Sequence, residues 1–128
     1  LAIVDFCKRQ GTLLLETIGH DTPIDRAAKR FMDGTTAQYH VRAKPLFPKE
    51  HYYINLLGEF IIDVWIDKKL HDQIEQLYHT ETRATKEWAN RLESLNALKG
   101  KSILVVSRNP KRAAALKKKL SRPFYIPK

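Results

Sequence analysis

The chain has 128 residues, of which 43% are hydrophobic and 29% charged, a composition typical of a folded domain and not of a disordered chain. No apolar run approaches the roughly 20 residues that a membrane helix needs, and the N-terminus lacks the pattern of a signal peptide. We therefore expect a cytoplasmic protein without membrane contact. The single cysteine, Cys7, excludes an internal disulfide and a cysteine-rich zinc site.

The net charge of +9 is concentrated at the C-terminus. Residues 1–98 contain 14 acidic and 13 basic residues, whereas residues 99–128 contain ten basic residues and no acidic one. This asymmetry predicts a polyanionic partner that is reached through the C-terminal segment. A solvated tail that maintains solubility is the alternative explanation.

Gly and Pro divide the first part of the chain into short segments. Apolar spacing predicts a helix over residues 1–10, and Thr12–Ile18 is either a short buried strand or a continuation of that helix. A second helix is expected to begin at Pro23, with Asp21 or Thr22 as its N-cap, and to end near Asp33.

The middle of the chain begins with a predicted strand, Thr36–Val41, because β-formers are frequent there. A loop containing Pro45 and Pro48 follows, and Lys49–Leu57 is interpreted as a short helix. After Gly58, the apolar and β-branched run Glu59–Ile66 predicts a core strand. One helix from Glu50 to Leu98 is the alternative.

Residues 67–98 contain neither Gly nor Pro and predict one long amphipathic helix. A helix of this length is too long to be covered by a small domain, so its apolar stripe predicts a homo-oligomer or a partner chain. The stripe consists of Leu70, Ile74, Leu77, Trp88, Leu92 and Leu95.

The last thirty residues predict a buried strand, Ser102–Val106, followed by a helix, Lys111–Leu120. Asn109 is a suitable N-cap for that helix and Pro110 a suitable first residue. Phe124–Ile126 is expected to form an edge strand or to dock on the core. Together the elements predict a single α+β domain, residues 1–128, with a small mixed sheet of about four strands flanked by helices.

The C-terminal helix and its flanks predict a nucleic-acid-binding surface. Lys and Arg neutralise phosphates without reading sequence, so the choice between DNA and RNA stays open. Phe124 and Tyr125 would stack on bases if they were exposed. The candidate contacts are Arg108, Lys111, Arg112, Lys117, Lys118, Lys119 and Arg122.

Three weaker constellations involve other chemistry. Ser107 and Asn109 lie at a strand-to-helix turn of the kind that holds an anion. His71, Glu75 and His79 follow each other at every fourth residue, a spacing that suits a divalent metal but is more often a solvated polar face. Asp63 is the one charge within an apolar strand, and it is either wet at a strand end or paired with a partner.

No catalytic motif stands alone in the sequence, so no catalytic residue, metal ligand or cofactor is assigned. The favoured hypothesis is a non-enzymatic nucleic-acid-binding domain that contacts phosphates through the basic segment 99–128. An assembly domain that pairs through the helix 67–98 is the first alternative. An enzyme or ligand sensor with an anion site at the turn 107–110 is the second.

Overall fold

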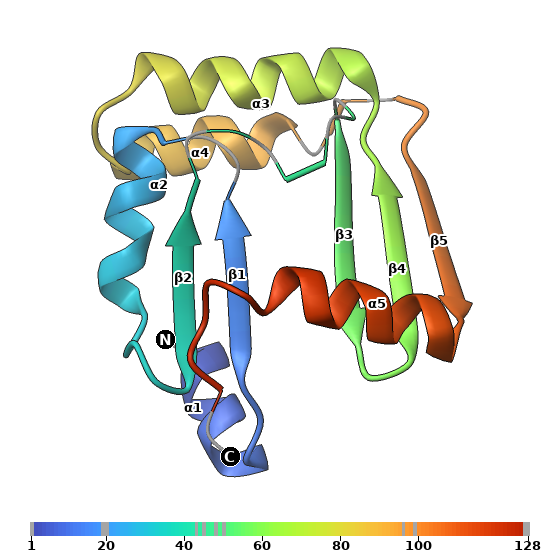
Figure 1. Cartoon of the computed structure of the whole chain (residues 1–128). Helices are drawn as coiled ribbons and strands as arrows, with labels where there is room; N and C mark the ends of the chain where they lie inside the picture. The colour runs from blue at the N-terminus through green and yellow to red at the C-terminus, as the bar shows by residue number, and fades with distance from the viewer. Residues whose placement is uncertain are drawn as a thin grey trace.

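The computed structural model describes residues 2–18, 21–42, 44, 46–47, 49, 51–95, 97–98 and 100–126. Within these residues it contains five strands in two sheets, with α-helices around them (Figure 1). The predicted α+β class is confirmed, but the prediction of one four-stranded sheet is wrong. The predicted loop prolines, Pro45 and Pro48, lie outside the described residues.

The first sheet is a parallel pair formed by β1 (Leu14–Ile18) and β2 (Ala37–Val41). Parallel strands need a crossover connection, and α2 (Pro23–Ala28) with the 3₁₀ turn Lys29–Phe31 supplies it. The strand interpretation of Thr12–Ile18 is therefore confirmed over the helical one, but the strand begins at Leu14 and its residues are half-buried. Ahead of it, α1 (Ala2–Gln10) agrees with the predicted first helix.

The N-terminus of α2 follows the expected capping chemistry. The Thr22 hydroxyl accepts a hydrogen bond from the N–H of Asp25 at 3.1 Å, and Pro23 occupies the first turn. The α-helix ends at Ala28, before the predicted end near Asp33, because the next three residues tighten into the 3₁₀ turn.

The second sheet is antiparallel, with the strand order β3 (Tyr52–Leu57), β4 (Phe60–Trp65), β5 (Ile103–Arg108). The predicted helix over Lys49–Leu57 is wrong. Gly58 has a φ of 60° and is the first residue of the two-residue turn that joins β3 to β4. A left-handed glycine at this position is typical of a tight β-hairpin, so the residue on each side of the turn belongs to a strand.

The predicted long helix is also wrong, because residues 68–95 form a hairpin of two helices. α3 (Lys68–Thr80) ends at Glu81, whose backbone is extended, and α4 (Lys86–Leu95) begins after Thr85. The Thr85 hydroxyl accepts the N–H of Trp88 at 3.1 Å, as an N-cap does. The two helices run side by side along one end of the sheets (Figure 1).

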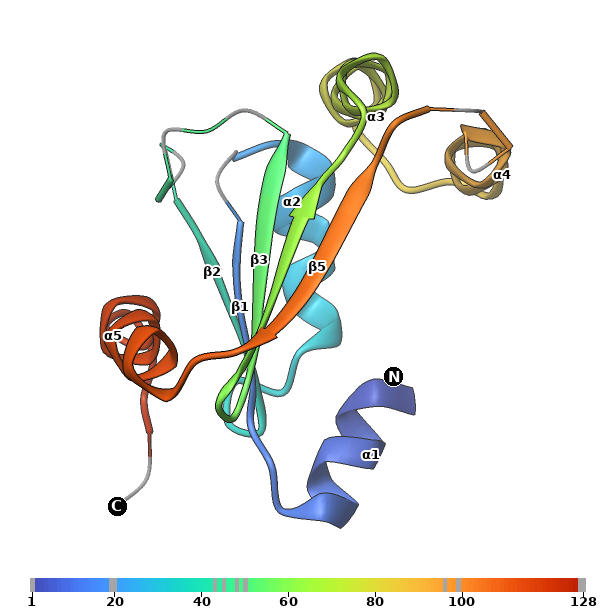
Figure 2. The same ribbon diagram turned by 90° about the vertical axis from the view of Figure 1, so that its right-hand side faces the viewer.

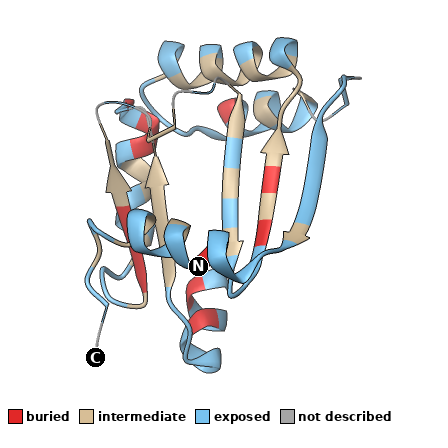
Figure 3. Cartoon of the chain, turned by 45° about the vertical axis from the view of Figure 1, so that its right-hand side comes forward, coloured by how far each residue is buried: buried red, intermediate tan, exposed pale blue. Residues whose placement is uncertain are grey.

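The strand prediction for β5 is confirmed, but the prediction that it is buried is wrong. β5 is an edge strand, and Ile103, Leu104, Val105 and Val106 have exposed fractions between 44% and 63%. Figure 3 shows exposure along nearly its whole length, whereas β4 beside it contains buried residues. A continuous apolar run therefore indicated a strand here without indicating burial.

α5 (Pro110–Leu120) crosses the strands on one side, and α1, α2 and α4 lie on the other (Figure 2). α5 agrees with the predicted C-terminal helix. The segment that follows it runs back toward β2 on the same side as α5 (Figure 1). Of the two predictions for Phe124–Ile126, docking is the one observed.

Candidate nucleic-acid interface

The position of α5 is fixed by its N-terminal turn. The Asn109 side chain accepts the N–H of Arg112 at 3.0 Å, and the Asn109 N–H donates to the carbonyl of Glu59 at 3.1 Å. The helix is therefore capped and attached to the β3–β4 hairpin at the same residue. Ala113 is buried and Leu116 half-buried, so the opposite side of α5 faces solvent.

Arg112 is paired with a buried carboxylate, although its own side chain is 42% exposed. Its guanidinium donates to both carboxylate oxygens of Asp63, each at 3.0 Å, and the Asp63 carboxylate also accepts the Tyr52 hydroxyl. Asp63 is 5% exposed. The hydrogen bonds from Arg112 hold the pKa of the Asp63 carboxyl below its ordinary value, so the aspartate is ionised and paired.

Arg108 is likewise bonded within the chain. Its guanidinium donates to one oxygen of the Glu59 carboxylate, from Nε at 3.0 Å and from Nη2 at 2.7 Å. Two of the seven predicted phosphate contacts thus have carboxylate partners of their own. No local pattern indicates these pairs, because each acidic residue lies 49 positions before its arginine in the chain.

The other five predicted cations lie on the exposed surface of α5 and just after it, and we call this group the basic face. All five are exposed, and none of them forms an ion pair with a carboxylate within the described part of the chain. The basic face consists of Lys111, Lys117, Lys118, Lys119 and Arg122.

The loop between β2 and β3 extends this charged surface. The Lys119 ammonium lies 5.0 Å from the centre of the Phe47 ring, and the Lys49 ammonium lies 4.9 Å from that of Tyr52. Both are cation–π distances, so aromatic rings support the lysines without neutralising them. Lys49 is thus a cation near α5 that the sequence alone did not connect with the C-terminal segment.

At the predicted anion site, Ser107 and Asn109, backbone N–H groups that could bind an anion already donate to acceptors within the chain. The backbone N–H groups of Asn109 and Arg112 both donate within the chain, and the Glu59 carboxylate lies beside Arg108 at the same turn. Ser107 is half-buried in β5. An anion site here stays a prediction, and the basic face does not depend on it.

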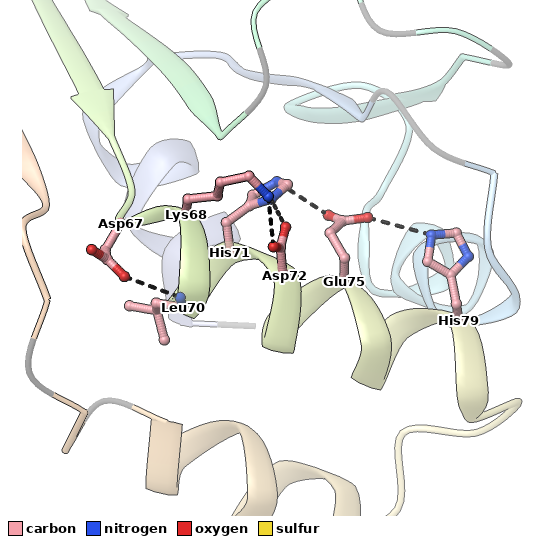
Figure 4. A network of polar contacts seen from close by, with 7 residues as sticks. All are labelled: Asp67, Lys68, Leu70, His71, Asp72, Glu75 and His79. Atoms are coloured by element: carbon pink, nitrogen blue, oxygen red, sulfur yellow. Dashed lines mark hydrogen bonds and ion pairs between the residues drawn. The ribbon is translucent and has the colours of Figure 1, made fainter.

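The predicted row of histidines and a glutamate does lie along one side of α3 (Figure 4). Glu75 bridges the two histidines, with 3.7 Å to His71 Nε2 and 3.4 Å to His79 Nε2. The His51 ring lies 5.9 Å from that of His71. No group of three metal-ligating side chains has the geometry for an ion among the described residues. His71 and Glu75 are half-buried and His79 is exposed, and a chemical role of this row stays a prediction.

The predicted interaction stripe is partly covered within the chain. Trp88 is buried, its indole N–H donates to the carbonyl of Leu77 at 3.2 Å, and its ring meets that of Tyr78 edge to face. The other stripe residues are half-buried: Leu70, Ile74, Leu77, Leu92 and Leu95.

Sequence reasoning missed a hollow beside β2. Lys29, Gln38, His40 and Phe124 contribute to its lining, and its volume is about 350 Å³. A second hollow of about 470 Å³ shares His40 and is also lined by Arg42 and Lys44. Gln38 and His40 are two residues apart on a strand, so the sequence could predict that they share one face of β2. It could not predict the hollow, because the other lining residues come from distant segments.

Comparisons with models of known protein families, with curated proteins and with solved structures found no match to this chain. In the described part of the chain no helix has both the length and the apolar character needed to cross a membrane.

Proposed function

We propose that this protein is a nucleic-acid-binding domain that contacts the phosphate backbone through the basic face of α5. The observation that carries the proposal is the set of five exposed cations without carboxylate partners among the described residues. They lie in a stretch, residues 99–128, that contains no Asp or Glu.

The C-terminal cations fall into two groups, one bonded to the fold and one exposed, and this difference supports the proposed function. Arg108 and Arg112 attach β5 and α5 to the β3–β4 hairpin, while Lys117, Lys118 and Lys119 lie within one turn of the helix and stay exposed. Lysines on a helix that is fixed to the fold present their charge in a defined place. Such cations release counterions from a polyphosphate chain, which gives affinity without sequence recognition.

The test compares two variants of equal net charge. Changing Lys117, Lys118 and Lys119 to Glu lowers the net charge from +9 to +3, and changing Lys69, Arg83 and Lys86 to Glu does the same. The control residues lie on α3, α4 and the turn between them, away from α5 (Figure 2).

Binding of a fluorescently labelled oligonucleotide is measured by anisotropy at about 50 mM salt. We expect the α5 variant to lose binding and the control variant to retain most of it. Equal losses in both variants would mean that net charge, and not the basic face, attracts the oligonucleotide. Full binding by the α5 variant would refute the proposal.

The alternative, assembly through the helix 67–98, assumes one long apolar stripe, whereas the structure has two shorter helices in this stretch. Contacts between α3 and α4 cover part of the stripe within the chain, at Trp88 above all. No observation favours it over the basic face.

A further inference from the structure

The basic face continues into the hollows beside β2, on the same side of the strands. Figure 1 shows the segment after α5 running toward β2, and Figure 2 shows it on the side of the strands that α5 occupies. Lys29 lines the first hollow, and Arg42 and Lys44 line the second. Arg122, from the basic face, precedes this segment directly. Cations therefore lie at the start of this segment and in the lining of both hollows at its β2 end.

An exposed aromatic residue, Tyr125, lies on this segment, and its backbone is bound to β2. The Gln38 side chain bonds the backbone of Tyr125 twice: its Nε2 donates to the Tyr125 carbonyl at 2.6 Å, and its Oε1 accepts the Tyr125 N–H at 2.9 Å. Gln38 itself is 8% exposed and also donates to the Thr35 carbonyl. Although its backbone is bound in this way, Tyr125 is 72% exposed.

The neighbouring aromatic, Phe124, helps to fix this segment. Its ring meets that of His40 edge to face at 6.2 Å, and His40 lines both hollows. Tyr125 is thus an exposed ring on a backbone that is anchored at two successive residues. The condition that the sequence left open, exposure of an aromatic residue beside the basic segment, is met by Tyr125 and not by the half-buried Phe124.

We propose that the ligand is single-stranded nucleic acid, with a base stacked on Tyr125 and the flanking phosphates on the basic face and on Arg42 and Lys44. This inference rests on the proposed function and adds the strandedness of the ligand. Bases in a duplex are already stacked on one another, so a lone exposed ring has no base face to contact. Bases of a single strand present free faces, and stacking tolerates any sequence.

The test measures the affinity of the full chain for one oligonucleotide as a single strand and as its duplex, at the same salt concentration. We expect tighter binding of the single strand. Tyr125→Ala should weaken single-strand binding by about tenfold and leave duplex binding unchanged, because base–aromatic stacking contributes roughly that much per base. Tyr125→Phe, which keeps the ring, should bind as the wild type does.

The control for the aromatic change is Phe6→Ala, which removes a ring that is 51% exposed on α1, on the other side of the strands. Thermal melting of each variant checks that the fold is retained, since the Gln38 bonds involve only the backbone of Tyr125. Binding of both forms with equal affinity, unaffected by Tyr125→Ala, would overturn the single-strand inference and leave the proposed function standing. Absence of binding to either form would refute the proposed function itself. Competition by an acidic peptide at similar concentration would assign the surface to proteins instead and overturn the inference.

Discussion

Arg112 on α5 and Asp63 on β4, the central strand of the three-stranded sheet, form a bidentate pair between the helix and the sheet. Both N–O distances are 3.0 Å, and the Asp63 side chain is 7% exposed while that of Arg112 is 42% exposed. The pair joins the helix that carries the basic face to the centre of the sheet. Arg112, which the sequence predicts as a phosphate contact, thus also positions α5.

We expect Arg112→Ala to lower the free energy of unfolding by about 2 kcal/mol, because it leaves a buried carboxylate with only the Tyr52 hydroxyl as a partner. The half-exposed guanidinium keeps the cost below that of a fully buried pair. Urea denaturation measures the change. A matched substitution, Lys111→Ala one residue earlier, should have almost no effect. Equal effects of the two would contradict the assignment of Arg112 to the fold.

The same pair predicts a loss of stability in acid. The pKa of Asp63 is lowered in the folded state, so its contribution is complete above the ordinary value of about 4 and is lost as the pH falls through the lowered one. Asp63→Asn should therefore be destabilising at pH 7 and much less so near pH 3. A difference from the wild type that is independent of pH would contradict the ionised pairing.

Asp63 also shows where sequence reasoning ended. The sequence identified it as the one charge in an apolar strand and left open whether it was wet or paired. Pairing requires Arg112, and nothing in the local pattern connects residues 49 positions apart. Periodicity did predict that α5 would turn Ala113 and Leu116 inward and its lysines outward. It could not show that Arg112, at the border between the buried and exposed sides of α5, bonds Asp63 in the sheet.

The errors in the fold have local physical causes. The helix prediction for Lys49–Leu57 rests on a short apolar run, which has no decisive period. The structure has a strand there that ends at a tight turn, and the first residue of this turn, Gly58, has a positive φ. The break between α3 and α4 contains no Gly or Pro. Its signals were weaker: a gap in the apolar stripe at Glu81, and Thr85 in a position to cap the next helix.

Glu16 predicts a pH dependence of the opposite sign. Burial raises the pKa of its carboxyl, and the nearby Asp25 carboxylate adds to the increase. The raised folded value means that stability is greatest below the ordinary pKa and declines as the pH rises through the raised one. Glu16→Gln should thus raise the free energy of unfolding at pH 7 and give no gain near pH 4. Glu93→Gln, at an exposed position on α4, is the control and should change little at either pH.

The helix hairpin predicts that Trp88 stabilises the chain from within. Trp88→Ala should cost about 3 kcal/mol, because it removes a buried ring, its contact with Tyr78 and the indole bond to Leu77. Chemical denaturation measures this, with Phe6→Ala as an exposed aromatic control. If Trp88 instead joined two chains, the substitution would alter the sedimentation coefficient and leave the unfolding free energy of the monomer unchanged.

The free edge of β5 predicts an effect on solubility. The Asn109 N–H bonds the Glu59 carbonyl, and the ladder alternates from there, so Leu104 and Val106 direct their backbone groups away from β4. An exposed apolar edge of this kind promotes association between molecules. Leu104→Lys should raise the protein concentration at which light scattering begins, without loss of stability. Leu57→Lys removes an exposed leucine at the hairpin turn, away from this edge, and should help less.

The central claim is that lysines of α5 bind phosphates, and the salt dependence of affinity tests it most directly. The dissociation constant for an oligonucleotide is measured from about 50 to about 200 mM salt for the wild type and for the variant with Lys117, Lys118 and Lys119 changed to Glu. Each phosphate contact contributes about 0.7–0.9 to the slope of the logarithm of affinity against that of salt concentration. We predict a steep slope for the wild type and a slope shallower by about 2 or more for the variant. Equal slopes for the two proteins would contradict the account.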